Sequence, residues 1–222
     1  MATMKKLTVA DLLAIKGKRK LMLVTAFDAW TAKAAEEAGV DMIVAWGADF
    51  ESTKYVVGEV RRGAPNTLIG SGINPSAYES QEKALRLANE IRAAGTDIVY
   101  CSGLETEKWT DVEATKLYKE VMALEAAGCI AIEMECVPEK VAAEISKCTK
   151  MLVFSMGSGP DCDGQFIFAE ELLRTNSGRF PRHAITYGNM YQDAVKHLTQ
   201  FCEDVKSGAY PTKKYSILKS LK

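Results

Sequence analysis

The stretch "ALEAAGCIAIEMECVPEKVAAEIS" (residues 123–146) decides the fold. It predicts a helix that ends at Gly128, a short strand over 129–136, and a second helix after Pro138. Units of this kind recur along the chain, and their strict alternation indicates parallel strands joined by helical crossovers. This alternation of strands and helices favours an α/β barrel over an open doubly wound sheet.

Seven short β-rich runs alternate with the expected helices. They lie at 20–27, 41–46, 67–73, 97–103, 129–136, 151–159 and 183–188. Four of the helices between them close on an "AG" or "SG" pair, where glycine can take the left-handed conformation that ends a helix. We predict one barrel domain over residues 1–222, with a short helix at its N-terminus.

Two carboxylates lie on one face of the strand at 129–136. Alternation puts Ile130, Ile132 and Met134 toward the helices, so that Glu133 and Glu135 point into the barrel. Glu135 is nearer the C-terminal mouth, where barrel active sites are built. A structural ion pair with a lysine or arginine is the alternative for either acid.

The glycine-rich stretch "MGSGPDCDGQ" (156–165) follows a strand. Its backbone N–H groups could cradle an anion, in which case Ser158 and Gly159 would contact substrate. A tight loop that needs glycine is an equally open interpretation. Asp161 and Asp163 suit helix caps or turns better than a cation site.

Composition excludes several classes of function. The 222 residues carry a formal net charge of −1, with acids and bases interspersed, so no nucleic-acid or membrane surface is expected. The basic run 16–20 is interpreted as a solvated turn. No apolar run is long enough to span a membrane, and no signal peptide is apparent. The six cysteines form no CxxC pair and indicate reduced thiols in the cytoplasm.

Several motifs together resemble one enzyme family. They are "LTVADLLAIKGKRKLMLVTAFDAW", "VRRGAPN", "AYESQEKAL", "ECVPE", "GPDCDGQ" and "EDVKSGAYPTKKYSI". The chain resembles ketopantoate hydroxymethyltransferases, the first enzymes of pantothenate synthesis. The resemblance implies a (βα)8 barrel of the phosphoenolpyruvate mutase type. It also implies hydroxymethyl transfer from methylenetetrahydrofolate to a 2-oxo acid held by magnesium, with Glu135 at the position of the family's general base.

The chain departs from this family at its metal ligands. The two metal-binding aspartates of the family match Gly47 or Ala48 and Gly72, and the family's Lys–Glu pair on the fourth strand matches Tyr100 and Ser102. We therefore predict no metal ligands and doubt magnesium, since it requires several oxygen donors. The residues at these matching positions become candidates for substrate binding.

A second departure is the loss of about one strand unit after residue 103, which predicts a seven-stranded barrel. The exposed edges at the gap predict a homo-oligomer, or cover by residues 104–112.

Glu133 is an acid where the family has an apolar residue. Like-charge repulsion between Glu133 and Glu135 would raise the pKa of one of them toward neutrality. Two functions remain open. The first is an enzyme that makes or breaks a C–C bond beside the carbonyl of a 2-oxo acid, by hydroxymethyl transfer or an aldol-type reaction, with Glu135 as base and Glu133 as its tuner. The second is a non-catalytic barrel that binds a metabolite or partners an active paralogue.

Overall fold

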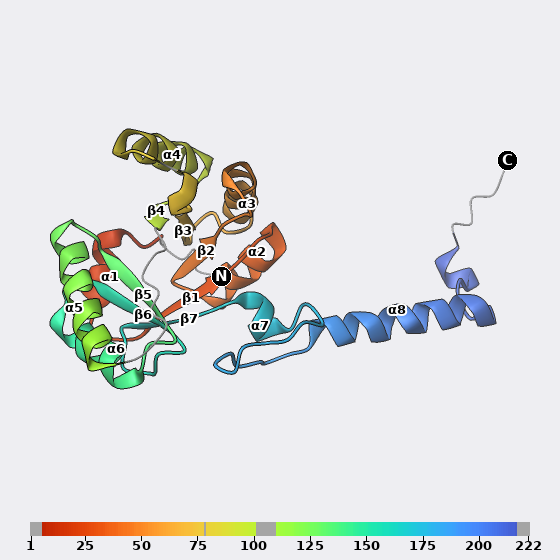
Figure 1. The fold of residues 1–222 in the computed structure, drawn as a ribbon. Helices are drawn as coiled ribbons and strands as arrows, with labels where there is room; N and C mark the ends of the chain where they lie inside the picture. Colours follow the sequence, from red (N-terminus) through yellow and green to blue (C-terminus); the bar gives the residue numbers. More distant parts are fainter. Residues whose placement is uncertain (1–5, 78, 101–109, 217–222) are drawn as a thin grey trace. The chain divides into compact units, whose positions relative to one another are not determined.

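Seven parallel strands form one sheet that curls around a lumen (Figure 1). The computed structural model describes residues 6–77, 79–100 and 110–216. The strand order is β4-β3-β2-β1-β7-β6-β5, and every neighbouring pair is parallel. The strands are β1 (Leu21–Thr25), β2 (Met42–Ala45), β3 (Leu68–Gly72), β4 (Ile98–Tyr100), β5 (Ala131–Glu135), β6 (Leu152–Met156) and β7 (Gly164–Ile167).

The sheet is open between β4 and β5, its two edge strands. Within the described ranges, no strand pairs with the outer side of either one. A side-chain hydrogen bond crosses this seam, because the Tyr100 hydroxyl donates to Glu133 Oε2 at 2.6 Å. The prediction of a seven-stranded α/β barrel fold is confirmed. Residues 101–109 lie outside the described part, so the predicted cover of the seam by residues 104–112 stays a prediction.

The position of the seventh strand was predicted wrongly. Residues 183–188 form no strand, and β7 instead follows β6 after the loop 157–163. This loop leads from the C-terminal end of one strand to the N-terminal end of its neighbour without a helix, whereas the helical rhythm of the other units predicts one. The seven residues of this loop are enough for the chain to run back along the length of the five-residue strand β6.

Local sequence chemistry sets both ends of several helices. Asp28, Asp49, Ser80 and Thr110 each cap a helix by accepting a backbone N–H three residues ahead. The predicted terminal glycines at 39, 95, 128 and 208 all have positive φ. The helices are α1 (Val9–Ile15), α2 (Ala29–Ala38), α3 (Phe50–Gly63), α4 (Gln81–Ala94), α5 (Asp111–Ala126), α6 (Glu139–Cys148), α7 (Ala169–Leu173) and α8 (Met190–Ser207), with 3-10 turns at Pro75–Ala77 and Lys213–Tyr215.

Strand alternation separates an inner core from outer ones. Side chains that face the lumen form one buried cluster, which includes Leu12 of α1. The opposite face packs against helices, as Ile132 and Met134 of β5 do in a cluster with α5 and α6. The predicted parity of β5 is therefore confirmed at these two positions, and Glu133 and Glu135 lie on the lumen side.

Ion pairs fasten the N-terminal ends of the strands. Lys16 Nζ donates to Asp163 Oδ2 at 2.5 Å and to the Met151 carbonyl oxygen at 2.8 Å. Arg19 pairs with the buried carboxylate of Asp41 at 2.6 Å. The basic run 16–20 is thus a turn, as predicted, but it is not simply solvated, because two buried or nearly buried carboxylates draw its cations inward. Asp163 lies before β7, far along the sheet from the mouth.

The chain divides into two compact units, Met1–Ala169 and Glu170–Lys222. The second contains α8, on which no residue is buried. Apolar side chains recur on this helix at three- and four-residue spacing: Tyr191, Val195, Leu198, Phe201 and Val205 are all exposed. A single domain over 1–222 stays a prediction. Among the described helices, none has the length and apolar character that crossing a membrane requires.

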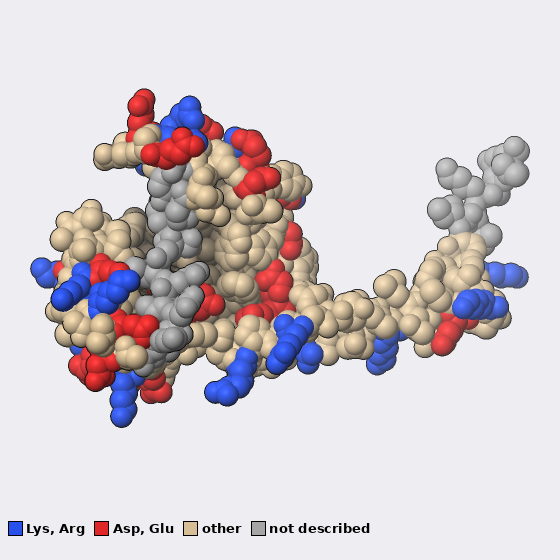
Figure 2. Space-filling model, in the orientation of Figure 1, with Lys and Arg blue, Asp and Glu red and all other residues tan. Residues whose placement is uncertain are grey.

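Charged side chains are mixed on the surface. Figure 2 shows acidic and basic groups side by side on the outer helices of the first unit, on the face that the view presents. Ion pairs three or four residues apart, such as Lys116–Glu120 on α5, account for part of this mixing. The surface agrees with the even charge balance of the sequence.

Candidate active site

A cavity of about 490 Å³ lies at the carboxyl ends of the strands, which we call the mouth. Loops after β2 and β3 form one side of it, and Tyr100, Glu133 and Glu135 lie on the other. The carboxyl ends of parallel strands are where barrel folds place their active sites. The mouth is therefore the candidate active site.

Glu133 is a carboxyl group at the mouth whose pKa the fold raises. Its side chain is half-buried on the lumen face of β5 and accepts the 2.6 Å hydrogen bond from Tyr100. Burial raises the pKa of Glu133 above its ordinary value, and the charge of Glu135 adds to this, while the Tyr100 hydrogen bond opposes it. Glu133 therefore keeps its proton to higher pH than a carboxyl group in water.

Glu135 lies one alternation closer to solvent, at the last position of β5, and is exposed. The chain turns sharply after it, because Cys136 has a φ of 53° and donates its N–H to the Met156 carbonyl oxygen at 2.8 Å. A left-handed conformation is unusual for a non-glycine residue and costs backbone energy. Residues held in this way cluster at functional sites, which agrees with the position of Glu135 at the mouth.

Ser158 fixes this turn from the neighbouring loop. Its buried hydroxyl donates to the Met134 carbonyl oxygen at 2.7 Å and accepts the Val137 N–H at 2.9 Å. Both bonds are internal to the protein, and neither Ser158 nor Gly159 lines the cavity. Their predicted contact with substrate stays a prediction, and the geometry gives Ser158 a structural role.

The other predicted substrate-binding residues gather at the mouth. Gly47, Ala48, Gly72 and Tyr100 all line the cavity, and Ser102 lies outside the described residues. Sequence reasoning missed an aromatic wall there, formed by Trp46, Phe166 and Phe168. Trp46 and Phe168 are in ring contact with centroids 5.5 Å apart. An aromatic residue directly after each of two strands was the signal that could have revealed this wall.

Comparison with known proteins identifies the family. The family model described as ketopantoate hydroxymethyltransferase matches residues 97–213. Curated relatives include 3-methyl-2-oxobutanoate hydroxymethyltransferase of Kosmotoga olearia, which is 30% identical over 92% of this chain and 95% of its own length. The enzyme of the same name from a Geobacillus species is 32% identical over 92% of this chain and 91% of its own. This chain belongs to the ketopantoate hydroxymethyltransferase family.

Solved structures agree in fold. Phosphonopyruvate hydrolase in complex with oxalate and Mg²⁺ superposes with a TM-score of 0.60 at 14% identity, over 98% of this chain and 93% of its own. Phosphoenolpyruvate phosphomutase of Streptomyces platensis gives 0.57 at 12% identity, over 91% and 88%. The alignment to the Kosmotoga relative runs over 254 residues, more than the 222 of this chain. It therefore contains gaps where family members have residues and this chain has none.

The described residues do not fit the magnesium site that the family implies. A Cβ atom at Gly47 would come within 2.6 Å of backbone atoms of α3, so a carboxylate cannot stand there unless the backbone shifts. At Gly72 the added Cβ would meet the Tyr100 ring at 3.2 Å. The carboxylate of Asp49 is engaged by the backbone N–H and hydroxyl of Ser52 at the start of α3.

Asp49, Glu133 and Glu135 line the mouth, and the role of Asp49 as a helix cap leaves Glu133 and Glu135 as the uncommitted carboxylates. Among the described residues, no group of three potential metal-binding side chains occurs. Two carboxylates fall short of the set of hard oxygen ligands that divalent magnesium prefers from a protein and its substrate. The groups that remain available for chemistry at the mouth are the carboxyl groups of Glu133 and Glu135 and the hydroxyl group of Tyr100.

Proposed function

We propose that this protein transfers a hydroxymethyl group to the carbon next to the carbonyl of a 2-oxo acid. The observation that supports this most is the pair of lumen-facing carboxyl groups, Glu133 and Glu135, at the mouth of a barrel of this family. The relatives are named for this reaction on 3-methyl-2-oxobutanoate. Glu135, which the resemblance places at the position of the family's general base, supports the transfer of their activity to this chain.

Glu135 removes the proton from C3 of the 2-oxo acid. The C3–H bond breaks, the proton moves to the Glu135 carboxylate, and the electron pair forms an enolate. The enolate carbon then attacks the methylene carbon of the one-carbon donor, which the resemblance implies is methylenetetrahydrofolate. One C–N bond of the donor breaks as the C–C bond forms, and the second breaks as water delivers its hydroxyl group to the same methylene carbon, with each electron pair left on nitrogen. The two donor nitrogens take up the C3 proton carried by Glu135 and the remaining proton of the water.

Glu133 stabilises the enolate in its protonated form. A carboxyl group that stays neutral can donate a hydrogen bond to a developing oxyanion, and burial favours that form here. The Tyr100 hydroxyl donates to Oε2 of Glu133, so the other carboxyl oxygen, Oε1, is the one assigned to the enolate. This assignment reverses the earlier expectation that Glu133 only tunes Glu135.

Product formation tests the proposal. The wild-type protein, supplied with 3-methyl-2-oxobutanoate, methylenetetrahydrofolate and added magnesium, is expected to form the hydroxymethylated 2-oxo acid, detected by mass spectrometry. Glu135→Gln keeps the shape of the side chain and removes the base, so turnover should fall by at least about 100-fold. Binding of the 2-oxo acid without any product would instead support the non-catalytic, metabolite-binding alternative.

We also propose that the protein acts in the cytoplasm as a homo-oligomer. Cys129, Cys148, Cys162 and Cys202 form no disulfide, which suits a reducing compartment. The uncovered apolar side chains of α8 support association between copies.

A further inference from the structure

The lumen below the two carboxyl groups is not filled. In most barrels of this type, inward side chains fill the interior in layers. Here β3 contributes Gly70 and β5 contributes Ala131 to those layers, and the described residues place no strand between β4 and β5. A cavity of about 230 Å³ remains, which we call the chamber, and both of these small residues line it.

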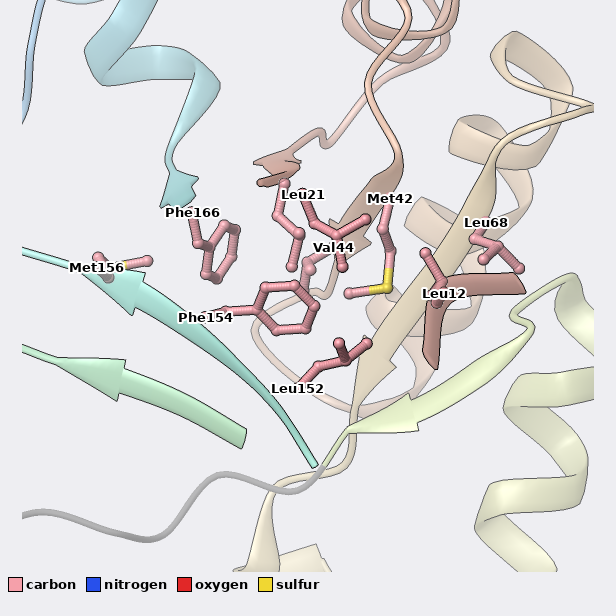
Figure 3. Close-up of a cluster of buried hydrophobic side chains, with 10 residues drawn as sticks. Leu12, Leu21, Met42, Val44, Leu68, Leu152, Phe154, Met156 and Phe166 are labelled. Carbon is pink, nitrogen blue, oxygen red and sulfur yellow. The ribbon is translucent and has the colours of Figure 1, made fainter. Parts of the chain in front are cut away.

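The walls of the chamber are mostly apolar, and Tyr100, Glu133 and Glu135 supply its polar groups. Figure 3 shows part of the buried cluster that faces the lumen, with Met42, Val44, Leu152, Phe154 and Phe166 drawn as sticks. All five line the chamber. The apolar part of the chamber gives water few hydrogen-bond partners, so an apolar group should displace water from that part favourably.

The chamber adjoins the candidate active site. Tyr100, Glu133 and Glu135 line both cavities, as do Val44 and Phe166. The hydrogen-bonded pair of Tyr100 and Glu133 therefore lies where the mouth meets the chamber. A ligand whose C3 atom lies at Glu135 would have its further substituents directed past Glu133 into the lumen, because Glu133 precedes Glu135 on the same face of β5.

We propose that the chamber is a subsite for the side chain of the substrate, and that the preferred substrates are 2-oxo acids with an apolar side chain longer than isopropyl. This inference rests on the proposed function. The polar end of such a molecule stays at the mouth with Glu135. Its hydrocarbon chain occupies the space that Gly70 and Ala131 leave open.

A series of straight-chain 2-oxo acids tests the chamber. Calorimetry on the wild-type protein, from 2-oxobutanoate to 2-oxooctanoate, should show the dissociation constant falling by about fourfold with each added methylene until the chamber is full. Ala131→Leu should abolish this gain and leave the affinity for 2-oxobutanoate within about twofold of wild type. Ala34→Leu, the same change on the exposed face of α2, should retain the full gain.

A second variant guards against misfolding of the first. Gly70→Val also fills the chamber, since an added Cβ meets Met42 and Val44 at 3.7–3.9 Å, an ordinary contact distance. Affinity that does not change with chain length, or an unchanged gain in both filled variants, would overturn the chamber as a subsite and leave the proposed function standing. Failure of every 2-oxo acid to bind, the short ones included, would refute the proposed function itself.

Discussion

At the scale of single residues, the pH dependence of stability should report the burial of Glu133. Its pKa is raised in the folded state, so the folded protein holds this proton to higher pH than the unfolded chain does. Glu133 therefore supports folding at acid pH, and that support is lost as pH rises through the raised pKa. Glu133→Gln has no carboxyl group at this position and does not lose this stability. The unfolding free energy of the variant should therefore exceed that of wild type by an amount that grows from acid to neutral pH.

Urea unfolding at a series of pH values measures this difference. Glu203→Gln, at an exposed position on α8, is the matched control and should follow wild type throughout. A Glu133→Gln variant that is less stable than wild type at neutral pH would mean that ionised Glu133 is stabilised in the fold, contrary to this account.

The sequence predicted the position of both acids but not which one the fold perturbs. Strand parity is a property of the backbone, so it placed Glu133 and Glu135 on the lumen face correctly. The raised pKa of Glu133 depends on burial and on Tyr100, which is 33 positions away in the chain and meets Glu133 only across the seam. Ser158 shows the same limit, because its two hydrogen bonds join the loop 157–163 to β5 and the turn after it, more than 20 positions earlier in the chain.

At the scale of helices and strands, the loop before β1 should be essential to stability. Lys16 is mostly buried and pairs with Asp163, whose side chain is only 9% exposed and also accepts the Val153 N–H. Lys16→Met leaves this carboxylate without its cation, which is expected to lower the unfolding free energy by about 3 kcal/mol.

Lys18→Met provides the control, since Lys18 is exposed in the same turn and its change should stay within about 0.5 kcal/mol. Chemical denaturation of both variants decides the matter. Equal stability of the two would show that the Lys16–Asp163 pair contributes little.

The regular units of the fold were predictable, and the exception was not. Helix caps and terminal glycines act within a few residues, so the sequence places them directly, as at Asp28 and Gly39. The strand β7 is short and follows a loop instead of a helix, so no local pattern distinguished it from the glycine-rich stretch before it. Its pairing with β1 is what makes it a strand, and that is a long-range contact.

At the scale of the whole molecule, the apolar side chains of α8 should be covered by a second copy. The side chain of Leu198 is 65% exposed and that of Phe201 is 52% exposed. Contiguous apolar surface of this kind is typical of sites that bind another protein. The outer face of β1 also leaves Met22 exposed, so the same chain offers apolar surface on both units. Light scattering should give a mass that is a multiple of the 24.3 kDa chain.

Leu198→Glu should dissociate this oligomer or strongly weaken it, because a charge at the interface is costly to desolvate. Lys196→Glu, on the same helix but outside the apolar stripe, is the control and should keep the wild-type mass. A monomeric wild-type protein at micromolar concentration would rule out the expected association.

The exchange of substrate protons with solvent tests the central claim, that Glu135 removes the C3 proton while Glu133 beside it on β5 stabilises the enolate. NMR in D₂O would follow the C3 proton of 3-methyl-2-oxobutanoate without any one-carbon donor, because enolisation needs only a base and stabilisation of the enolate. Wild type is expected to exchange this proton, Glu135→Gln to lose the exchange while remaining folded, and Glu133→Gln to retain part of it through its amide donor. Equal exchange by wild type and Glu135→Gln, or none by wild type when the 2-oxo acid is bound, would contradict the account.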